Sequence, residues 1–580
     1  MGQSAEDAAR PAEPAKDEVP SDVVRLRAQL VMPDTVQPGA TELHQLSVVE
    51  AGRLIERRQI SPIELTQAFL DRAEALDPQL NAFLLLTADH AMAQARVAEA
   101  DIAAGRRRGA LHGIPFALKD IFSTAGIRTT GHSRVCAEAV PTQDAFAVTR
   151  LYEAGGVLLG KLATHEFAHG GPSFDLPWPP ARNPWNTGHF TGGSSSGSGA
   201  AVAAGLTPAA LGSDTGGSIR LPAALCGIVG LKPTYGLVSR RGVYPNSFTF
   251  DHAGPMTWTV ADCAAVLAAI AGHDPEDPAS ADRPVPDYAA ALGGDLRGVR
   301  IGVVRHFHET DIETDPEVAA ALETALTVLR SLGAVIEDVR LRPAKDYSDV
   351  KVTIAESELF SIHAATLRTR PGDFGDDFLG RALGAVLISG ADYMEAQRER
   401  RQMLAELRQV WQRYDALVTP TAPTPAPALG RWRTVNFWQK ASFTSPWNVS
   451  AGPALSQCMG FSTDGLPLAL QIAGRPFDDA TVLRIGYAYE QATGWRNRRP
   501  TLLPGAVPPP LPPAPEPSSD LGAEARAAVA QACRRAGLNL TDRQFEMVCV
   551  AAPYVEAMTT RLRHPRPFGD EPANIFLAPS

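Results

Sequence analysis

Two serine- and glycine-rich clusters and one upstream lysine are the residues of this chain best suited to chemistry. The clusters are Gly192–Gly199, which reads GGSSSGSG, and Asp214–Ser218, which reads DTGGS, while Lys119 lies in the phrase GIPFALKD. Glycine lets backbone N–H groups approach a ligand closely, and serine hydroxyls can attack a carbonyl or relay protons. A lysine in an apolar strand can lose its charge and act as a base. These are the parts of an acyl-transfer site.

Seven phrases, in order along roughly residues 43–500, carry a resemblance to a known family. They are GIPFALKD, RNPWN, GGSS, GSDTGGSIR, CGIVGLKPTYG, DHAGPM and GLPLALQIAGRPFDDATVL. In this order they resemble the amidase signature family of Ser–Ser–Lys hydrolases. The resemblance implies an enzyme that cleaves non-peptide carbon–nitrogen bonds through a serine acyl-enzyme. It also implies a mixed twisted sheet sandwiched between helices, in agreement with the alternating strand and helix patterns, which predict an α/β fold.

The resemblance assigns catalytic roles to three residues. Ser218 is the expected nucleophile, Ser194 the expected proton relay and Lys119 the expected general base. In the family, the peptide bond before the relay serine is cis. A free lysine has a pKa near ~10.4, so burial of Lys119 must lower its pKa if the amine is to be neutral near pH 7.

Further residues are expected to support the reaction. The backbone N–H groups expected to form the oxyanion hole belong to one tight turn: Thr215, Gly216, Gly217 and Ser218. Three residues are expected to hold the geometry: Ser195, Asp214 and Arg220. Three more, at the end of GKLATHEF and just after it, are expected to line the substrate pocket: Phe167, Ala168 and Gly170.

Residues 193–197 also match the GxSxG nucleophile elbow of α/β-hydrolases. That interpretation needs a strand directly before the serine, whereas residues 182–190 are rich in proline and glycine. His112 and His252 are the nearest histidines of interest, and we interpret both as structural hydrogen-bonding groups. The elbow is therefore the less favoured alternative.

Composition bears on partners and compartment. The chain has 580 residues and a net charge of −10, whereas nucleic-acid-binding surfaces usually need clustered Lys and Arg. Its six cysteines form no CxxC pair and no metal-ligand spacing, so neither a metal nor a cofactor is expected. Residues 2–20 lack the apolar core of a signal peptide, and no apolar run approaches the roughly 18 residues of a membrane span. We expect a cytoplasmic enzyme with a small-molecule amide substrate, without nucleic-acid or membrane partners, that can form a homodimer.

Four segments are predicted: a mobile N-terminal segment (1–42), a catalytic domain (43–503), a proline-rich linker (504–517) and a small helical domain (518–580). The linker reads PGAVPPPLPPAPEP, which is typical of an extended, semi-rigid spacer. The last segment, with two predicted helices, resembles the small C subunit of tRNA-dependent amidotransferases and related amidase-partner proteins. A plain helical appendage is the alternative, and we expect this tail to be separable from the core.

The favoured function is a stand-alone amidase that hydrolyses an amide-type bond of a small molecule. Linear and aryl amides, ureides and carbamates all fit the same machinery. The alternative is the glutaminase (A-type) subunit of a tRNA-dependent amidotransferase, which would release ammonia from glutamine inside a complex. A non-catalytic interaction protein is hard to reconcile with the joint presence of Lys119, Ser194 and Ser218.

Overall fold

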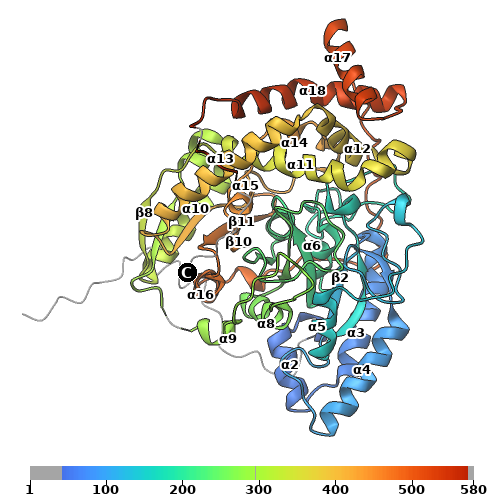
Figure 1. The fold of residues 1–580 in the computed structure, drawn as a ribbon. Coiled ribbons are helices and arrows are strands. Elements are labelled where there is room, and N and C mark those ends of the chain that lie inside the picture. Colours follow the sequence, from blue (N-terminus) through green and yellow to red (C-terminus); the bar gives the residue numbers. More distant parts are fainter. Residues whose placement is uncertain (1–41, 294, 568, 573–580) are drawn as a thin grey trace, which may run out of the picture.

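The computed structural model describes residues 42–293, 295–567 and 569–572 (Figure 1). The predicted N-terminal segment 1–42 lies outside the described residues except for its last residue. Within the described ranges, 11 strands form one sheet in the order β1-β3-β2-β4-β6-β5-β10-β11-β9-β7-β8. The strands are β1 Phe83–Leu86, β2 Pro115–Lys119, β3 Val157–Leu162, β4 Ala209–Asp214, β5 Val229–Lys232, β6 His252–Thr257, β7 Arg300–Val303, β8 Val335–Asp338, β9 Ala416–Pro420, β10 Ala454–Phe461 and β11 Pro467–Gly474. Parallel and antiparallel pairs both occur, so the sheet is mixed.

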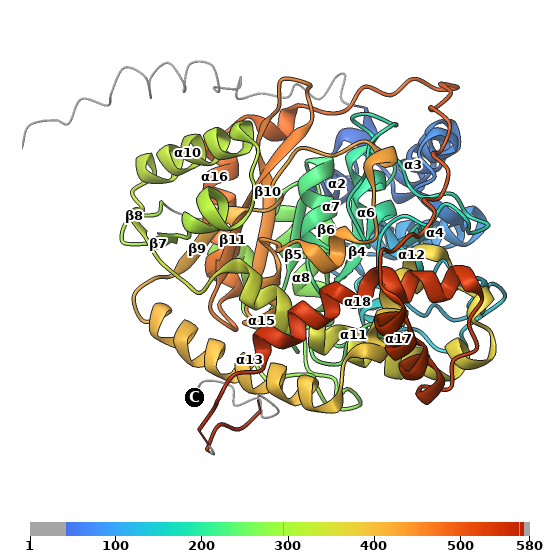
Figure 2. The same ribbon diagram turned by 90° about the horizontal axis from the view of Figure 1, so that it is seen from above.

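Helices surround this sheet, and the predicted α/β fold class is confirmed (Figures 1 and 2). They are α2 Val48–Glu56, α3 Pro62–Leu76, α4 Ala88–Ala103, α5 Phe146–Glu153, α6 Ser196–Ala203, α7 Arg220–Cys226, α8 Val260–Ile270, α9 Tyr288–Ala291, α10 Pro316–Ser331, α11 Ala344–Thr369, α12 Asp376–Ala382, α13 Gly390–Val410, α14 Asn436–Gln439, α15 Ser445–Val449, α16 Asp479–Ala492, α17 Ala523–Arg535 and α18 Asp542–Leu562. None of the helices in the described ranges is long and apolar enough to span a bilayer.

The two faces of the sheet are covered by different helices because side chains alternate along each strand. In β4, Ala209 and Leu211 belong to the core cluster that includes α8, whereas Ala210 belongs to the cluster that includes α6 and α7. All eight residues of α6 are buried, and a Cβ on Gly197 would lie 2.4 Å from the carbonyl oxygen of Ala82. Small residues therefore let α6 approach the sheet closely.

The sheet topology brings the lysine and the nucleophile turn together. Strands β2 and β4 are parallel neighbours, and parallel neighbours end at the same edge of a sheet. Lys119 is the last residue of β2, and β4 ends at Asp214, directly before the turn that carries Ser218. Lys119 and Ser218 are almost a hundred positions apart in the sequence, and the pairing of β2 with β4 brings them to the same edge of the sheet.

The C-terminal helices lie on the core. Figure 1 shows α18 running along the outer side of α11 to α14. Val555 and Met558 of α18 are buried in one cluster with Val352 of α11 and Trp438 of α14. Arg561 adds an ion pair to Asp349 on α11, with 2.5 Å between Nε and Oδ2. The tail therefore covers an apolar surface of the core, which the sequence did not reveal, and the four-segment division stays a prediction.

Candidate active site

Lys119 is fully buried at the edge of the sheet. Its Nζ atom lies 2.7 Å from Oγ of Ser194 and 2.8 Å from Oγ of Ser213. Burial lowers the pKa of Lys119 well below its usual value, although the carboxylates of Asp214 and Asp251 oppose this shift. The side chain can therefore lose its proton more readily than a surface lysine, as a general base must.

Ser194 joins this lysine to a loop on the other side. The Gly193–Ser194 peptide bond is cis, and the Ser194 hydroxyl donates to the carbonyl oxygen of Ala168 over 2.6 Å. Asn246 donates to the same carbonyl through Nδ2 at 2.9 Å. Ala168 has φ +60°, in the left-handed region that side chains rarely adopt, so this carbonyl is held in place by local structure.

Ser218 lies in the turn after β4 and is the most accessible residue of the expected triad. It is half-buried, whereas Lys119 and Ser194 are buried. Its carbonyl accepts the N–H of Ser195 at 3.2 Å, which ties the two Ser/Gly segments together. The Ser195 hydroxyl strengthens this tie, since it accepts the N–H of Ser213 at 3.2 Å. The structure thus places all three expected catalytic side chains in one region, and their catalytic roles stay predictions.

Asp214 and Arg220 form a buried ion pair beneath the nucleophile turn. Arg220 Nη2 lies 2.9 Å from Asp214 Oδ1, and Asn448 donates to the same oxygen at 2.8 Å. Burial alone would raise the pKa of Asp214, but Arg220 and Asn448 hold it well below its usual range. Arg220 also donates to Gln471 on β11, at 2.8 Å. The pair therefore anchors the turn to the centre of the sheet.

The same carboxylate changes the expected oxyanion hole. The Gly217 N–H donates to Asp214 Oδ1 at 2.8 Å, so this donor is already occupied. Of the four N–H groups expected from the sequence, those of Thr215, Gly216 and Ser218 are left for an oxyanion. The sequence could not reveal this difference, because it depends on the rotamer that Arg220 imposes on Asp214.

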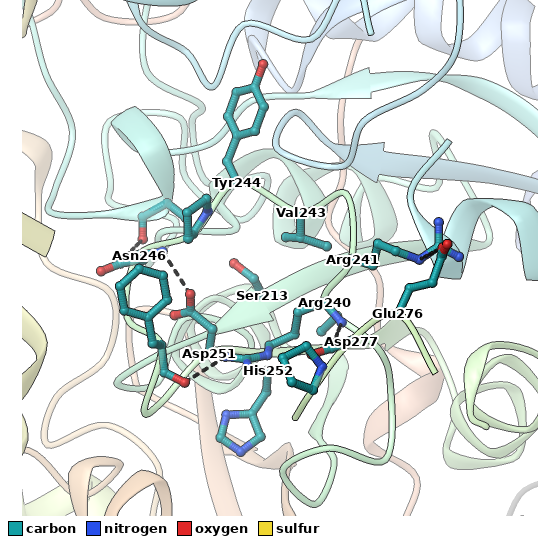
Figure 3. Close-up of a pocket in the computed structure, with 15 residues that line it drawn as sticks. Ser213, Arg240, Arg241, Val243, Tyr244, Asn246, Asp251, His252, Glu276 and Asp277 are labelled. Atoms are coloured by element: carbon teal, nitrogen blue, oxygen red, sulfur yellow. Dashed lines mark hydrogen bonds and ion pairs between the residues drawn. The ribbon is translucent and has the colours of Figure 1, made fainter. Parts of the chain in front are cut away.

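The three residues expected to line the substrate pocket have different surroundings. Ala168 lines a cavity of about 280 Å³, shown in Figure 3. Phe167 instead packs against the rings of His363 and Phe378 and belongs to the core. A Cβ on Gly170, which has φ +82°, would lie 2.5 Å from an Asp377 oxygen, so glycine is needed there.

The cavity of Figure 3 reaches the catalytic region through Ser213, which contacts Lys119. Asp251 lines the same cavity and accepts a hydrogen bond from the Thr215 hydroxyl at 2.6 Å. Burial raises the pKa of Asp251. Sequence reasoning did not single out Ser213, Asn246 or Asp251 as site residues. The signal for two of them was present, since Ser213 belongs to GSDTGGSIR and Asp251 begins DHAGPM.

The nucleophile-elbow alternative does not fit this geometry. An elbow needs a strand before its serine and a helix after it. Helix α6 does follow Ser195, but no strand lies in residues 182–190, all of which the structure describes. His252 Nδ1 lies 2.6 Å from the Phe250 carbonyl oxygen, and His112 Nδ1 accepts the Arg108 N–H at 3.0 Å. Both histidines therefore make structural hydrogen bonds.

Known proteins resemble the chain over most of its length. Residues 64–483 match the Amidase family. The A subunit of glutamyl-tRNA(Gln) amidotransferase from Chloroflexus aggregans is 43% identical over 489 residues, which cover 80% of this chain and 99% of that protein. The solved structure of the protein of the same name from Thermotoga maritima is 35% identical, covers 78% of this chain and 96% of the other, and has a TM-score of 0.67. A structure described as a vestigial protein complex behind an s-triazine catabolic enzyme is 34% identical, with coverage of 77% and 98% and a TM-score of 0.73.

These relatives correct two expectations from the sequence. A stand-alone amidase of a small molecule was favoured, but the curated relatives at 41–43% identity are A subunits of an amidotransferase. The expectation of no nucleic-acid partner is wrong for the same reason, since the name of these relatives includes a tRNA. Net charge describes a single chain, so it cannot exclude a partner subunit that contacts nucleic acid.

The resemblance seen in the sequence is confirmed by the family match and by the architecture. The match at 64–483 contains Lys119, Ser194 and Ser218 and leaves α17 and α18 outside it. The chain therefore belongs to the amidase family, whose enzymes hydrolyse carbon–nitrogen bonds.

Proposed function

We propose that this chain is the glutaminase (A-type) subunit of a tRNA-dependent amidotransferase. The observation that carries the proposal is the identity of 43% to the A subunit of glutamyl-tRNA(Gln) amidotransferase, over 99% of that protein. The geometry supports it, because a buried lysine lies 2.7 Å from a buried serine, and the backbone of the next serine is bonded to a half-buried serine in a glycine-rich turn. The reaction would be hydrolysis of the side-chain amide of glutamine, with ammonia as the product that the complex uses.

The proposed mechanism uses the proton relay. Neutral Lys119 takes the proton of Ser194, which takes that of Ser218 as its oxygen attacks the amide carbon. The oxyanion is held by the N–H groups of Thr215, Gly216 and Ser218. The proton returns through Ser194 to the nitrogen, ammonia leaves, and an ester joins the acyl group to Ser218. Water, deprotonated by the same relay, then cleaves this ester and frees Ser218.

The tail and the charge of the chain bear on its partners. With a net charge of −10, this chain is a poor nucleic-acid surface by itself, so partner subunits would supply the contacts to tRNA. The tail, which resembles a small C subunit, already packs on the core of the same chain: α18 shares a buried cluster with α11 and α14, and Arg563, directly after α18, pairs with Asp392 on α13. We therefore propose that the tail takes the place of a separate small subunit on these helices.

Ammonia release by the purified full-length chain tests the proposal. Glutamine is compared with a panel of linear amides, ureides and carbamates, in the presence and absence of glutamyl-tRNA and the partner subunits of a related amidotransferase. We expect glutamine to be hydrolysed, faster when the complex can form, and Ser218→Ala to be inactive. Rapid turnover of other amides without turnover of glutamine under either condition would contradict the proposal.

A further inference from the structure

Lys351 is a buried lysine that lies against the nucleophile turn. It belongs to α11, is 7% exposed, and faces Gly216: a Cβ on that glycine would lie 2.8 Å from Cε and 2.9 Å from Nζ of the lysine. Gly216 is two residues from Ser218, and two extended residues span at most ~7 Å. The ammonium group is therefore close to the place where the substrate carbonyl must lie.

No polar partner holds this ammonium group within the described part of the chain. The three fully buried lysines of the described ranges are all bonded to polar groups. Lys119 lies 2.7 Å from Oγ of Ser194, Lys161 lies 3.2 Å from Oδ1 of Asp120, and Lys232 donates to the Pro233 carbonyl at 3.1 Å. Lys351 has only a ring contact, with Nζ 5.5 Å from the centre of the Phe437 ring.

The charged neighbours of Lys351 have other partners. Burial lowers the pKa of Lys351, and Glu356 is the acidic group that opposes this shift most. Glu356 Oε2 lies 3.2 Å from Nε2 of His169, and the two form an ion pair when that histidine is protonated. Arg381 pairs with Asp377 at 3.3 Å and stacks on the ring of Phe437, 4.4 Å from its centre. Asp214 and Asp251 act on Lys351 from the turn side, but Asp214 is bound by Arg220 and Asp251 by the Thr215 hydroxyl. Among the described residues around this turn, Lys351 is thus the cation whose charge is left without a direct partner.

An unpaired buried charge is unfavourable, so a side chain of this kind is expected where a ligand completes the pair. We infer that Lys351 binds a carboxylate of the substrate and restricts the enzyme to short amides that carry an anionic group a few bonds from the scissile carbonyl. For glutamine as substrate, this inference rests on the proposed function. The carboxylate of glutamine is separated from its side-chain amide by a short aliphatic chain, as the inference requires. The inference extends to any small ω-amide of a carboxylic acid.

Paired substrates test this inference. L-glutamine is compared with its α-methyl ester, and succinamate with its methyl ester, because each ester removes the negative charge and keeps the amide. Lys351→Met removes the charge and keeps the apolar stem. Lys345→Met is the matched control, since Lys345 lies on the same helix and pairs with Asp349 at 3.1 Å. We expect Lys351→Met to raise KM for the acids about 10- to 100-fold, as loss of a charged hydrogen bond does, and to change KM for the esters less than twofold.

Each outcome supports or overturns the inference. Lys351→Arg should keep most of the preference for acids, because it keeps the charge. If Lys351→Met does not fold, two other measurements compare charged with uncharged ligands. One is the preference of Lys351→Arg for acids over esters, and the other is the inhibition of the unaltered enzyme by glutarate, which should be stronger than inhibition by glutaramide. The inference is overturned if Lys351→Met loses activity equally on acids and esters, or if its preference for acids over esters is unchanged. Two outcomes separate this inference from the proposed function. If Lys351→Met loses the preference for succinamate over its ester and the enzyme does not hydrolyse glutamine, the inference is supported and the proposed function is rejected. If the enzyme hydrolyses glutamine and Lys351→Met keeps its preference for acids over esters, the proposed function is supported and the inference is rejected.

Discussion

The hydroxyl of Ser194 donates a hydrogen bond to the carbonyl of Ala168 over 2.6 Å. Since Lys119 lies 2.7 Å from the same hydroxyl, Ser194 has two neighbours that compete for its proton. A protonated Lys119 can only donate, and the serine proton is then left to Ala168. A neutral Lys119 can accept it instead. The proton relay therefore begins with the loss of a proton from Lys119.

The first prediction concerns the pH dependence of amide hydrolysis. Burial lowers the pKa of Lys119 from 10.5, so the neutral fraction grows as pH rises through a lower value. We expect kcat/KM to rise with pH through one apparent pKa below 10.5, which belongs to the coupled relay rather than to one residue. Lys119→Ala should be nearly inactive near neutral pH and partly recover at high pH, where hydroxide replaces the base.

Lys119→Arg is the sharper variant, because guanidinium stays protonated at every working pH and cannot accept the proton. It should not restore activity. An active arginine variant, or an alanine variant with a normal rate and an unchanged pH profile, would show that Lys119 is not the base.

The second prediction concerns the nucleophile. Ser218→Ala should lower kcat to less than about a hundredth of its normal value and leave the fold unchanged, because only background catalysis is left without a nucleophile. The measurement is a steady-state rate together with circular dichroism. Ser195→Ala is the control, since Ser195 holds backbone groups and should keep part of the activity. A serine-directed inhibitor should add its mass to Ser218, and modification of Ser195 instead would reject this assignment.

The third prediction concerns the buried ion pair below the turn. Asp214→Asn leaves the Arg220 guanidinium buried and uncompensated, which costs about 3–5 kcal/mol of unfolding free energy. The control is Asp295→Asn, because Asp295 pairs with an Arg297 side chain that is 83% exposed and such a pair is worth at most about 1 kcal/mol. Denaturant unfolding of both variants measures the difference, and equal small losses would contradict the role given to Asp214.

This stabilisation has a defined pH dependence. The folded-state pKa of Asp214 is lowered, so the carboxylate stabilises the fold above its unfolded value of 3.8, and the effect is lost as pH falls toward the folded value. The stability gap between the unaltered chain and Asp214→Asn should therefore be constant from neutral pH to about pH 5 and shrink below about pH 4.

The triad candidates could be predicted because each lies within a short, distinctive phrase, and strand β2 could be read from the apolar run before Lys119. The contacts between phrases could not be predicted. Whether the Gly217 N–H faces an oxyanion or the Asp214 carboxylate depends on how Arg220 turns that carboxylate. Lys351 gave no signal in the sequence, because only the packing of α11 against the turn brings it to Gly216.

The contacts of the C-terminal tail could not be predicted from the sequence either. The sequence predicted a separable unit, because two helices follow a proline-rich run. A sequence pattern can indicate that a helix buries one face, but it does not indicate which surface that face contacts. The structure places that face on α11, α12 and α14, where Cys549, Ala551 and Val555 are each at most 1% exposed. The surface beneath them is therefore part of the core in this chain.

The last prediction follows from that contact. A chain ending at Leu503 would expose the apolar surface around Val352 and Trp438, and it would remove the Arg561 partner of Asp349, two residues from Lys351. We expect this shortened chain to aggregate or to unfold at a lower temperature, as light scattering and thermal unfolding would show. Within the full chain, Met558→Ala should cost about 2–5 kcal/mol, because a buried side chain leaves a cavity. Val507→Ala, at a linker position that is 92% exposed, is the control and should change stability by less than about 0.5 kcal/mol. A shortened chain that stays monodisperse with an unchanged unfolding temperature would restore the view of the tail as separable.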